Sequence, residues 1–382
     1  MTPLDAAMEA YVVQVQDELT ALIRDLVAIP APSGQERARA QFCCDWFRRH
    51  GGNASIDAAD NVLLPVNVDL DGTDALDVIM AHTDTVFPDT TGFAVRAEGG
   101  FLCAPGIVDD TANLAVMMVC ARFFLASGRF PAGRRGILFV ADSGEEGLGN
   151  LRGCREIMTR FGCRIAEFVA LDSPDLRRVV TRSVGSHRYR VQVRTTGGHS
   201  FADFGRRNAI DVLAELIVRL KSAQLPQEEG RKTTSNVGVI SGGSSVNAIA
   251  QSAEMLYEYR SESQAELLKL SEFFRRTVSE FRSPDVAVTV EMLGDRPGAG
   301  NVDPVRSAQL LERCRAAVRA VTGKGILPES GSTDCNLPLA AGIPAICFGV
   351  CRGTGTHTRE EKLDVSSLSD GCRLLLDFIC RR

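Results

Sequence analysis

Apolar runs of strand length alternate with amphipathic helical patterns along much of this chain. The runs lie at residues 61–68, 74–82, 134–142, 166–172 and 343–350. Helical patterns separate several of them, and this alternation is typical of a mostly parallel sheet flanked by helices. The first thirty residues also show a helical pattern, and Ser33 and Glu36 have the spacing of a capping box at the start of a further helix. The sequence therefore predicts the α/β class.

The middle of the chain has a different pattern. Between residues 183 and 295 the expected order is strand, helix, strand, strand, helix, strand, and this βαββαβ order is that of a ferredoxin-like domain. The glycine-rich stretch 294–301 then resembles a linker that returns to the first domain. We therefore predict a catalytic domain in two parts, 1–183 and 296–382, interrupted by an inserted domain at 184–295.

Composition narrows the range of functions. The length of 382 residues suits two domains. With 45% apolar residues and a net charge of −5, the chain has the composition of a soluble globular protein and offers no basic surface for nucleic acid. The longest apolar run, 112–126, is interrupted by Arg122 and is too short to span a membrane, so we expect a buried helix. No signal-peptide pattern is present, and the twelve cysteines form no C-x-x-C pair, which favours the cytoplasm.

Potential metal ligands follow the predicted strands. His82 and Asp84 end one strand, the pair Glu145 and Glu146 follows another, and Asp172 ends a third. Two further segments carry similar side chains, namely Asp109 with Asp110 before the buried helix and His357 in a glycine-rich loop. Ligand sites of open α/β sheets lie beyond the carboxyl ends of the strands, so we expect these groups to lie together.

Such a set of imidazoles and carboxylates suits zinc, with cobalt or manganese as substitutes, and it is large enough for two ions. One of two adjacent glutamates can bind metal while the other takes a proton from water. Taken singly, each motif has a simpler interpretation: His82 as a core histidine, "GEEG" as a solvated turn, and Asp109 with Asp110 as helix N-terminal acids. Their shared placement after strands favours a metal-dependent hydrolase.

The motifs "AHTDTV", "APGIVDD", "SGEEG", "LDSPD", "GGHS", "GSTD" and "GTHTREE" occur in this order. Together with the βαββαβ insert, they resemble the di-zinc exopeptidase and amidohydrolase family of peptidase T, glutamate carboxypeptidase, aminoacylase and succinyl-diaminopimelate desuccinylase. The resemblance covers nearly the whole chain. It implies a zinc exopeptidase-like fold in which the insert is a lid and dimerisation domain, and therefore a homodimer.

The resemblance also assigns roles to individual residues. It implies that His82 and Asp172 bind one zinc ion, that Glu146 and His357 bind the other, and that Asp109 bridges the two ions. By the same comparison Glu145 is the general base, and Asp84 fixes the ring of His82 by accepting its hydrogen bond. The peptide bond after the bridging aspartate is typically cis in this family.

Other positions match residues that contact substrate in the family. His199 corresponds to a histidine that stabilises the tetrahedral intermediate, often from the partner subunit. Asn247 and Arg260 match substrate-binding positions, and Arg260 suits a carboxylate. The match is imperfect, because Ala250 and Glu258 stand where the family usually has proline and aspartate. Backbone groups at Gly331 in "GSTD" correspond to a further substrate contact.

Three functions follow from the resemblance. The first is a peptidase T-like exopeptidase that hydrolyses short peptides, favoured by "HTREE" and "VAIPAPSGQE". The second is an amidohydrolase of N-acyl amino acids, of the aminoacylase, deacetylase or glutamate carboxypeptidase type. The third is an inactive relative that serves as a binding protein, although none of the expected ligands is missing from the sequence.

Overall fold

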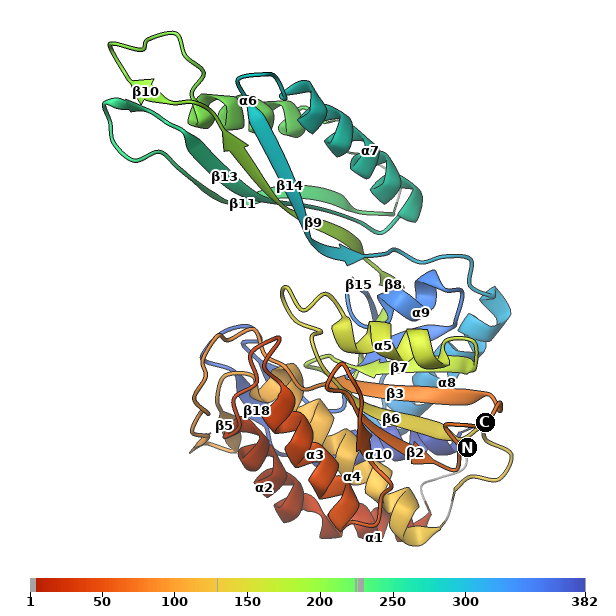
Figure 1. Cartoon of the computed structure of the whole chain (residues 1–382). Coiled ribbons are helices and arrows are strands. Elements are labelled where there is room, and N and C mark those ends of the chain that lie inside the picture. The colour runs from red at the N-terminus through yellow and green to blue at the C-terminus, as the bar shows by residue number, and fades with distance from the viewer. Residues whose placement is uncertain (1–4, 129, 224, 226–229, 382) are drawn as a thin grey trace. The chain divides into compact units, whose positions relative to one another are not determined.

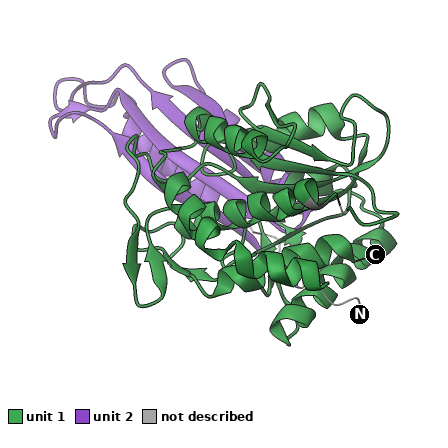
Figure 2. Ribbon diagram, turned by 90° about the horizontal axis from the view of Figure 1, so that it is seen from below, with its two compact units in different colours: residues 1–183, 300–382 green, residues 184–299 purple. Residues whose placement is uncertain are grey.

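The computed structural model describes residues 5–128, 130–223, 225 and 230–381. It divides into two compact units, shown in Figure 2. Unit 1 comprises residues 1–183 and 300–382, and unit 2 comprises residues 184–299. Among the described residues, no helix is both long enough and apolar enough to cross a membrane.

Unit 1 is built on a mixed sheet with the strand order β1-β2-β6-β3-β7-β16-β8-β15. The strands are β1 (Ser55–Ile56), β2 (Val62–Val66), β3 (Leu76–His82), β6 (Ile137–Asp142), β7 (Ile165–Leu171), β8 (Arg178–Ser183), β15 (Leu327–Gly331) and β16 (Ala345–Phe348). The central pairs β6-β3, β3-β7 and β7-β16 are parallel. The predicted fold class, a mostly parallel α/β sheet, is confirmed.

Helices cover both faces of this sheet (Figure 1). One face carries α1 (Ala6–Gln14), α2 (Gln16–Val27), α3 (Arg37–Arg49), α4 (Ala112–Ser127), α8 (Pro304–Thr322) and α10 (Ser367–Cys380), and the other carries α5 (Arg152–Phe161) and α9 (Asn336–Ala340). Side chains of a strand alternate between the two faces. In β3, Ile79 and Ala81 join the core around α4, whereas Val78 and Met80 join the core around α5. Because both faces are covered, the strands β3, β6 and β16 are buried along their whole length.

The N-terminal segment differs from the expectation in two respects. The predicted first helix is two helices, because α1 ends at Gln14 and α2 begins at Gln16. The predicted capping box is wrong, because α3 begins at Arg37 with Glu36 as its N-cap residue. Ser33 lies outside the helix, and its hydroxyl binds a carboxylate elsewhere in unit 1.

A small antiparallel sheet, β17-β18-β5-β4, holds two further segments of the predicted site. Its strands are β4 (Arg96–Glu98), β5 (Phe101–Cys103), β17 (Gly353–Thr354) and β18 (Lys362–Asp364). The loop from β17 to β18 carries His357, whose backbone φ is 64°. The π-helical turn η1 (Ile107–Thr111) follows β5 and carries Asp109, and the peptide bond between Asp109 and Asp110 is cis, as expected.

Unit 2 has the βαββαβ element order expected for the insert. Its elements are β9 (Gly185–Arg194), α6 (Ala209–Lys221), β11 (Thr233–Gly242), β13 (Ser252–Ser261), α7 (Gln264–Glu280) and β14 (Ala287–Arg296), with a short pair β10 (Gly198–His199) and β12 (Ala248–Ile249). The sheet order is β11-β13-β9-β14, with antiparallel neighbours throughout. Phe274 of α7 stacks on Tyr189 of β9, with the ring centroids 4.2 Å apart, and this stack lies in the unit's own core.

Candidate metal centre

Three neighbouring strands deliver predicted ligands to one edge of the main sheet. His82 is the last residue of β3, Asp172 directly follows β7, and Glu145 and Glu146 lie in the loop after β6. Because β6, β3 and β7 are parallel neighbours, their carboxyl ends meet at the same edge. His82, Glu145 and Glu146 are all buried there.

Asp109 lies between the two histidines. Its Oδ1 is 3.0 Å from Nε2 of His82, and its Oδ2 is 3.1 Å from Nε2 of His357. Nε2 of His357 is also 2.9 Å from Oε1 of Glu146. Asp109 thus presents one oxygen to each imidazole, which is the arrangement needed for a carboxylate that bridges two ions.

The side chains fall into overlapping groups of possible ligands. The ligand atoms of His82, Asp109 and Asp172 lie within 4.8 Å of one another, and so do those of Asp109, Glu146 and His357. These groups share Asp109 and coincide with the two predicted zinc sites. Imidazole nitrogen and carboxylate oxygen are donors that suit zinc, cobalt and manganese. The residues therefore fit a pair of divalent ions.

The electrostatics of the cluster also favour bound cations. Burial raises the pKa of Asp172 well above its usual range, and the charge of Asp109 adds to this shift. Burial likewise raises the pKa of Asp110. Hydrogen bonds with Asp109 and Glu146 raise the pKa of His357 to about 11. Several carboxylates therefore repel one another in a buried space, and divalent cations would relieve that repulsion.

His82 is oriented mainly by the backbone. Its Nδ1 donates to the carbonyl oxygen of Asp84 at 3.0 Å, so that Nε2 faces the ligand cluster. The carboxylate of Asp84 is farther from Nδ1, at 3.5 Å. It accepts instead from the backbone N–H groups of Glu145 and Glu146, at 3.1 and 3.0 Å. The carboxylate of Asp84 therefore holds the turn that carries Glu145 and Glu146, called the glutamate turn below. Its backbone carbonyl orients the ring of His82.

Glu361 has a supporting position that the sequence did not single out. Its Oε2 accepts from the N–H groups of Val108 and Asp109, at 2.9 and 3.3 Å. Its Oε1 accepts from the N–H of His357 at 3.2 Å. The buried carboxylate thereby joins the segments of two predicted ligands. Its only local signal is the repeated glutamate in "HTREE", which gives no indication of these distant partners.

The remaining predicted residues lie elsewhere. Gly331 ends β15 of unit 1, whereas His199, Asn247 and Arg260 belong to unit 2. Nδ1 of His199 accepts from the N–H groups of Phe201 and Ala202, so the neutral ring carries its proton on Nε2. Arg260 is engaged by its neighbour Glu258 through two hydrogen bonds of 3.0 Å.

Comparison with known proteins identifies the family. The model of peptidase family M20/M25/M40 matches residues 78–381, which include all five predicted ligands. The chain belongs to this family. It is therefore a hydrolase of peptide or amide bonds, and its cluster of donor groups fits the metal dependence of a metallopeptidase.

Individual proteins are similar to this chain, in sequence or in structure, over nearly its whole length. A succinyl-diaminopimelate desuccinylase of Corynebacterium glutamicum is 26% identical over 370 residues, which are 94% of this chain and 95% of that protein. Aminopeptidase PepT of Bacillus cereus has a TM-score of 0.70 at 23% identity and covers 95% of this chain and 98% of its own. A Bacillus subtilis protein described as a dinuclear metal-binding peptidase of family M20 has a TM-score of 0.67 at 15% identity, with coverages of 96% and 98%. The two structural likenesses show the shared fold.

Proposed function

We propose that this chain is a dinuclear metal-dependent exopeptidase that hydrolyses the amide bond of short peptides. The observation that carries the proposal is the position of Asp109, with its two carboxylate oxygens 3.0 and 3.1 Å from the Nε2 atoms of His82 and His357. His82 and Asp172 would hold one ion, and Glu146 and His357 the other. Zinc is the proposed metal, with cobalt or manganese as substitutes.

Glu145 is the proposed general base. Two ions bound in this cluster would polarise the scissile carbonyl and lower the pKa of the attacking water. The buried Glu145 carboxylate has a ligand atom within 4.8 Å of those of His82 and Glu146. It would accept a proton as water oxygen bonds to the carbonyl carbon, and it would pass that proton to the amine nitrogen as the C–N bond breaks. The products are a carboxylate and an amine.

His199 is the proposed donor to the developing oxyanion. Its Nδ1 accepts two backbone N–H groups of its own loop, which leaves the Nε2–H of the neutral ring free to donate to an oxyanion. Asn247, Arg260 and the backbone at Gly331 are the proposed substrate contacts. For Arg260 to bind a substrate carboxylate, its hydrogen bonds with Glu258 would have to be shared or exchanged.

A second candidate substrate class is the N-acyl amino acids. It is supported by the desuccinylase of Corynebacterium glutamicum, which is similar over 94% of this chain. The donor set of unit 1 serves either substrate, because the same amide bond is broken in both. The choice between a free amino end and an acyl group therefore depends on the substrate contacts. We also propose a cytoplasmic homodimer that assembles through unit 2.

The test is a mixed library of dipeptides, tripeptides and N-acyl amino acids, incubated with zinc- or cobalt-loaded protein and followed by mass spectrometry. A chelated sample is the control. We expect metal-dependent loss of peptides with free amino ends. Selective loss of N-acyl amino acids would move the protein to the second class, and consumption of nothing while two metals stay bound would contradict both.

A further inference from the structure

We propose that Ser33 is a positioning residue for the turn that carries Glu145 and Glu146. The position of this turn depends on Asp84, whose fully buried carboxylate accepts both backbone N–H groups of the turn. The proposed base and a proposed ligand are adjacent in the chain. A displacement of Asp84 would therefore move both groups together.

Ser33 contacts the same carboxylate oxygen that accepts the N–H of Glu146. Its hydroxyl lies 2.6 Å from Oδ2 of Asp84 and 3.3 Å from the carbonyl oxygen of Glu146. The charged and closer oxygen is the stronger acceptor, so the hydroxyl donates to Asp84. One hydroxyl is thus in contact with both the carboxylate that holds the turn and the turn itself.

The segment that carries Ser33 is itself fixed. Thr85 N–H donates to Ala31 at 2.9 Å, and the buried guanidinium of Arg39 donates to the carbonyl of Thr83 at 2.8 Å. Residues 31–39 are thereby tied to the backbone on both sides of Asp84. Hydrogen bonds therefore hold the backbone near Ser33 against the residues that flank Asp84.

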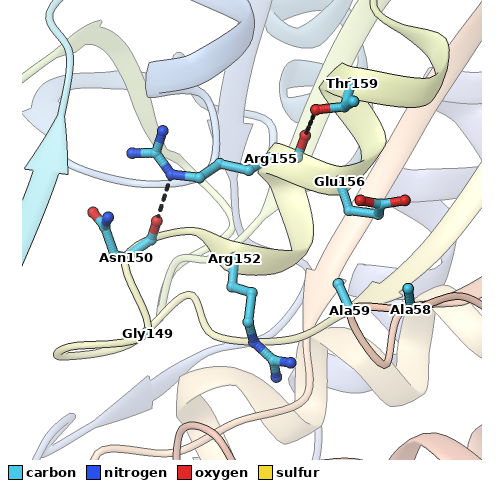
Figure 3. Close-up of a pocket in the computed structure, with 8 residues that line it drawn as sticks. All are labelled: Ala58, Ala59, Gly149, Asn150, Arg152, Arg155, Glu156 and Thr159. Atoms are coloured by element: carbon cyan, nitrogen blue, oxygen red, sulfur yellow. Dashed lines mark hydrogen bonds between the residues drawn. The ribbon is translucent and has the colours of Figure 1, made fainter.

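A further hydrogen bond joins residues 31–39 to the start of helix α5, which follows the glutamate turn. Arg152 donates to the buried carboxylate of Glu36 at 2.8 Å. Arg152 lines a surface pocket of about 450 Å³, and its side chain points away from that of Arg155 (Figure 3). Nε of Arg155 donates to the carbonyl of Asn150. The loop after β6 is therefore fixed at its outer end as well as at the glutamates.

The arrangement excludes the helix-capping role predicted for Ser33. Helix α3 begins four residues later and has no side-chain cap. Loss of the hydroxyl should therefore leave the helix intact and act on the turn. Removing an outer partner of a metal site typically lowers affinity or activity about 10–100-fold, so Ser33→Ala should lower kcat about tenfold and leave KM within about twofold.

The experiment compares Ser33→Ala, Ser33→Thr and a control, Thr322→Val. The control removes a hydroxyl at the end of α8 that donates to Val318 and accepts from Lys324. Each variant is measured for kcat, KM and thermal unfolding. Each is also titrated with Co²⁺, whose visible absorption reports ligand geometry. We expect Ser33→Ala to lower kcat and alter the cobalt spectrum, Ser33→Thr to restore both, and Thr322→Val to leave both unchanged.

The kinetic part rests on the proposed function, but the cobalt titration does not require turnover. If the wild type consumed no substrate, the proposed function would fail while the spectra still tested Ser33. An unaltered cobalt spectrum together with wild-type kcat in Ser33→Ala would overturn the inference. Equal losses in Ser33→Ala and Thr322→Val would also overturn it, because they would show a general cost of removing a hydroxyl.

Discussion

The two units differ in how far the surroundings of their proposed functional residues are exposed. In unit 1, His82, Asp84 and Glu145 are buried, and backbone and side-chain hydrogen bonds fix their surroundings. In unit 2, the region of His199 exposes Phe201 at 89% and Val246 at 102% of their reference areas. A buried polar cluster is preorganised for chemistry before substrate arrives. An exposed apolar loop tip is instead suited to contact with another molecule.

The largest effect should come from Glu145. Glu145→Ala removes the proposed base while leaving the ligand groups, so kcat should fall about 10²–10⁴-fold with two metals still bound. Steady-state kinetics and metal analysis of the dialysed variant measure the two quantities. Glu156→Ala, on helix α5 of the same unit, is a control that should keep wild-type kcat. An active Glu145→Ala enzyme would refute the role of Glu145 as the general base.

Metal binding should depend steeply on pH. The pKa of His357 is raised to about 11 by its hydrogen bonds with Asp109 and Glu146, so in protein stripped of metal its imidazole is protonated at neutral pH. An ion must displace that proton, and affinity should rise about tenfold per pH unit for each proton displaced. Zinc titrations at pH 6 and 8, with an indicator dye for released protons, measure this. His357→Ala should reduce the proton release, whereas His50→Ala, at the C-cap of helix α3, should not.

The buried side of this comparison, the donor cluster of unit 1, could largely be predicted from the sequence. The proposed ligands His82, Glu146 and Asp172 lie at or after the carboxyl ends of apolar strands, and the architecture of a parallel sheet brings such positions together. The hydroxyl of Ser33, by contrast, binds Asp84 across 51 residues, and Glu361 binds the N–H of Asp109 across 252 residues. For Ser33 the local pattern indicated a helix cap. Nothing in a short window of sequence reports a partner so far along the chain.

A smaller loss of metal affinity should follow from changing Glu361. Glu361→Gln replaces one acceptor oxygen with an NH2 group, so either the N–H groups of Val108 and Asp109 or the N–H of His357 lose their acceptor. The two ligand segments would then be joined less firmly, and metal affinity should fall about tenfold. Competition with a chelator measures the change. Glu360→Gln, the adjacent exposed residue, is the matched control, and equal affinities in the two variants would refute the role of Glu361.

The exposed apolar residues on an edge strand of unit 2 should form the dimer interface. Strand β11 is an edge of the sheet, and its Val239 and Ile240 are 50% and 56% exposed. Exposed edge strands pair with other chains unless charge or cover prevents it. Light scattering at micromolar concentration should therefore show a dimer for the wild type and a monomer for Ile240→Lys. Met292→Lys, on the opposite edge strand β14, should remain dimeric, and a monomeric wild type would contradict the proposed assembly.

The smallest effect should be seen when an exposed aromatic residue of unit 2 is removed. Phe201 is 89% exposed and Phe274 is 1% exposed. Phe274 also stacks on Tyr189, so Phe274→Ala should lower the free energy of unfolding by about 3–5 kcal/mol. Phe201→Ala should change it by no more than about 0.5 kcal/mol, because little apolar surface is returned to water. Denaturant unfolding measures both variants. A comparable loss of unfolding free energy in Phe201→Ala would mean that the side chain of Phe201 is packed against other residues in solution. The difference drawn between the buried cluster of unit 1 and the exposed loop of unit 2 would then be wrong.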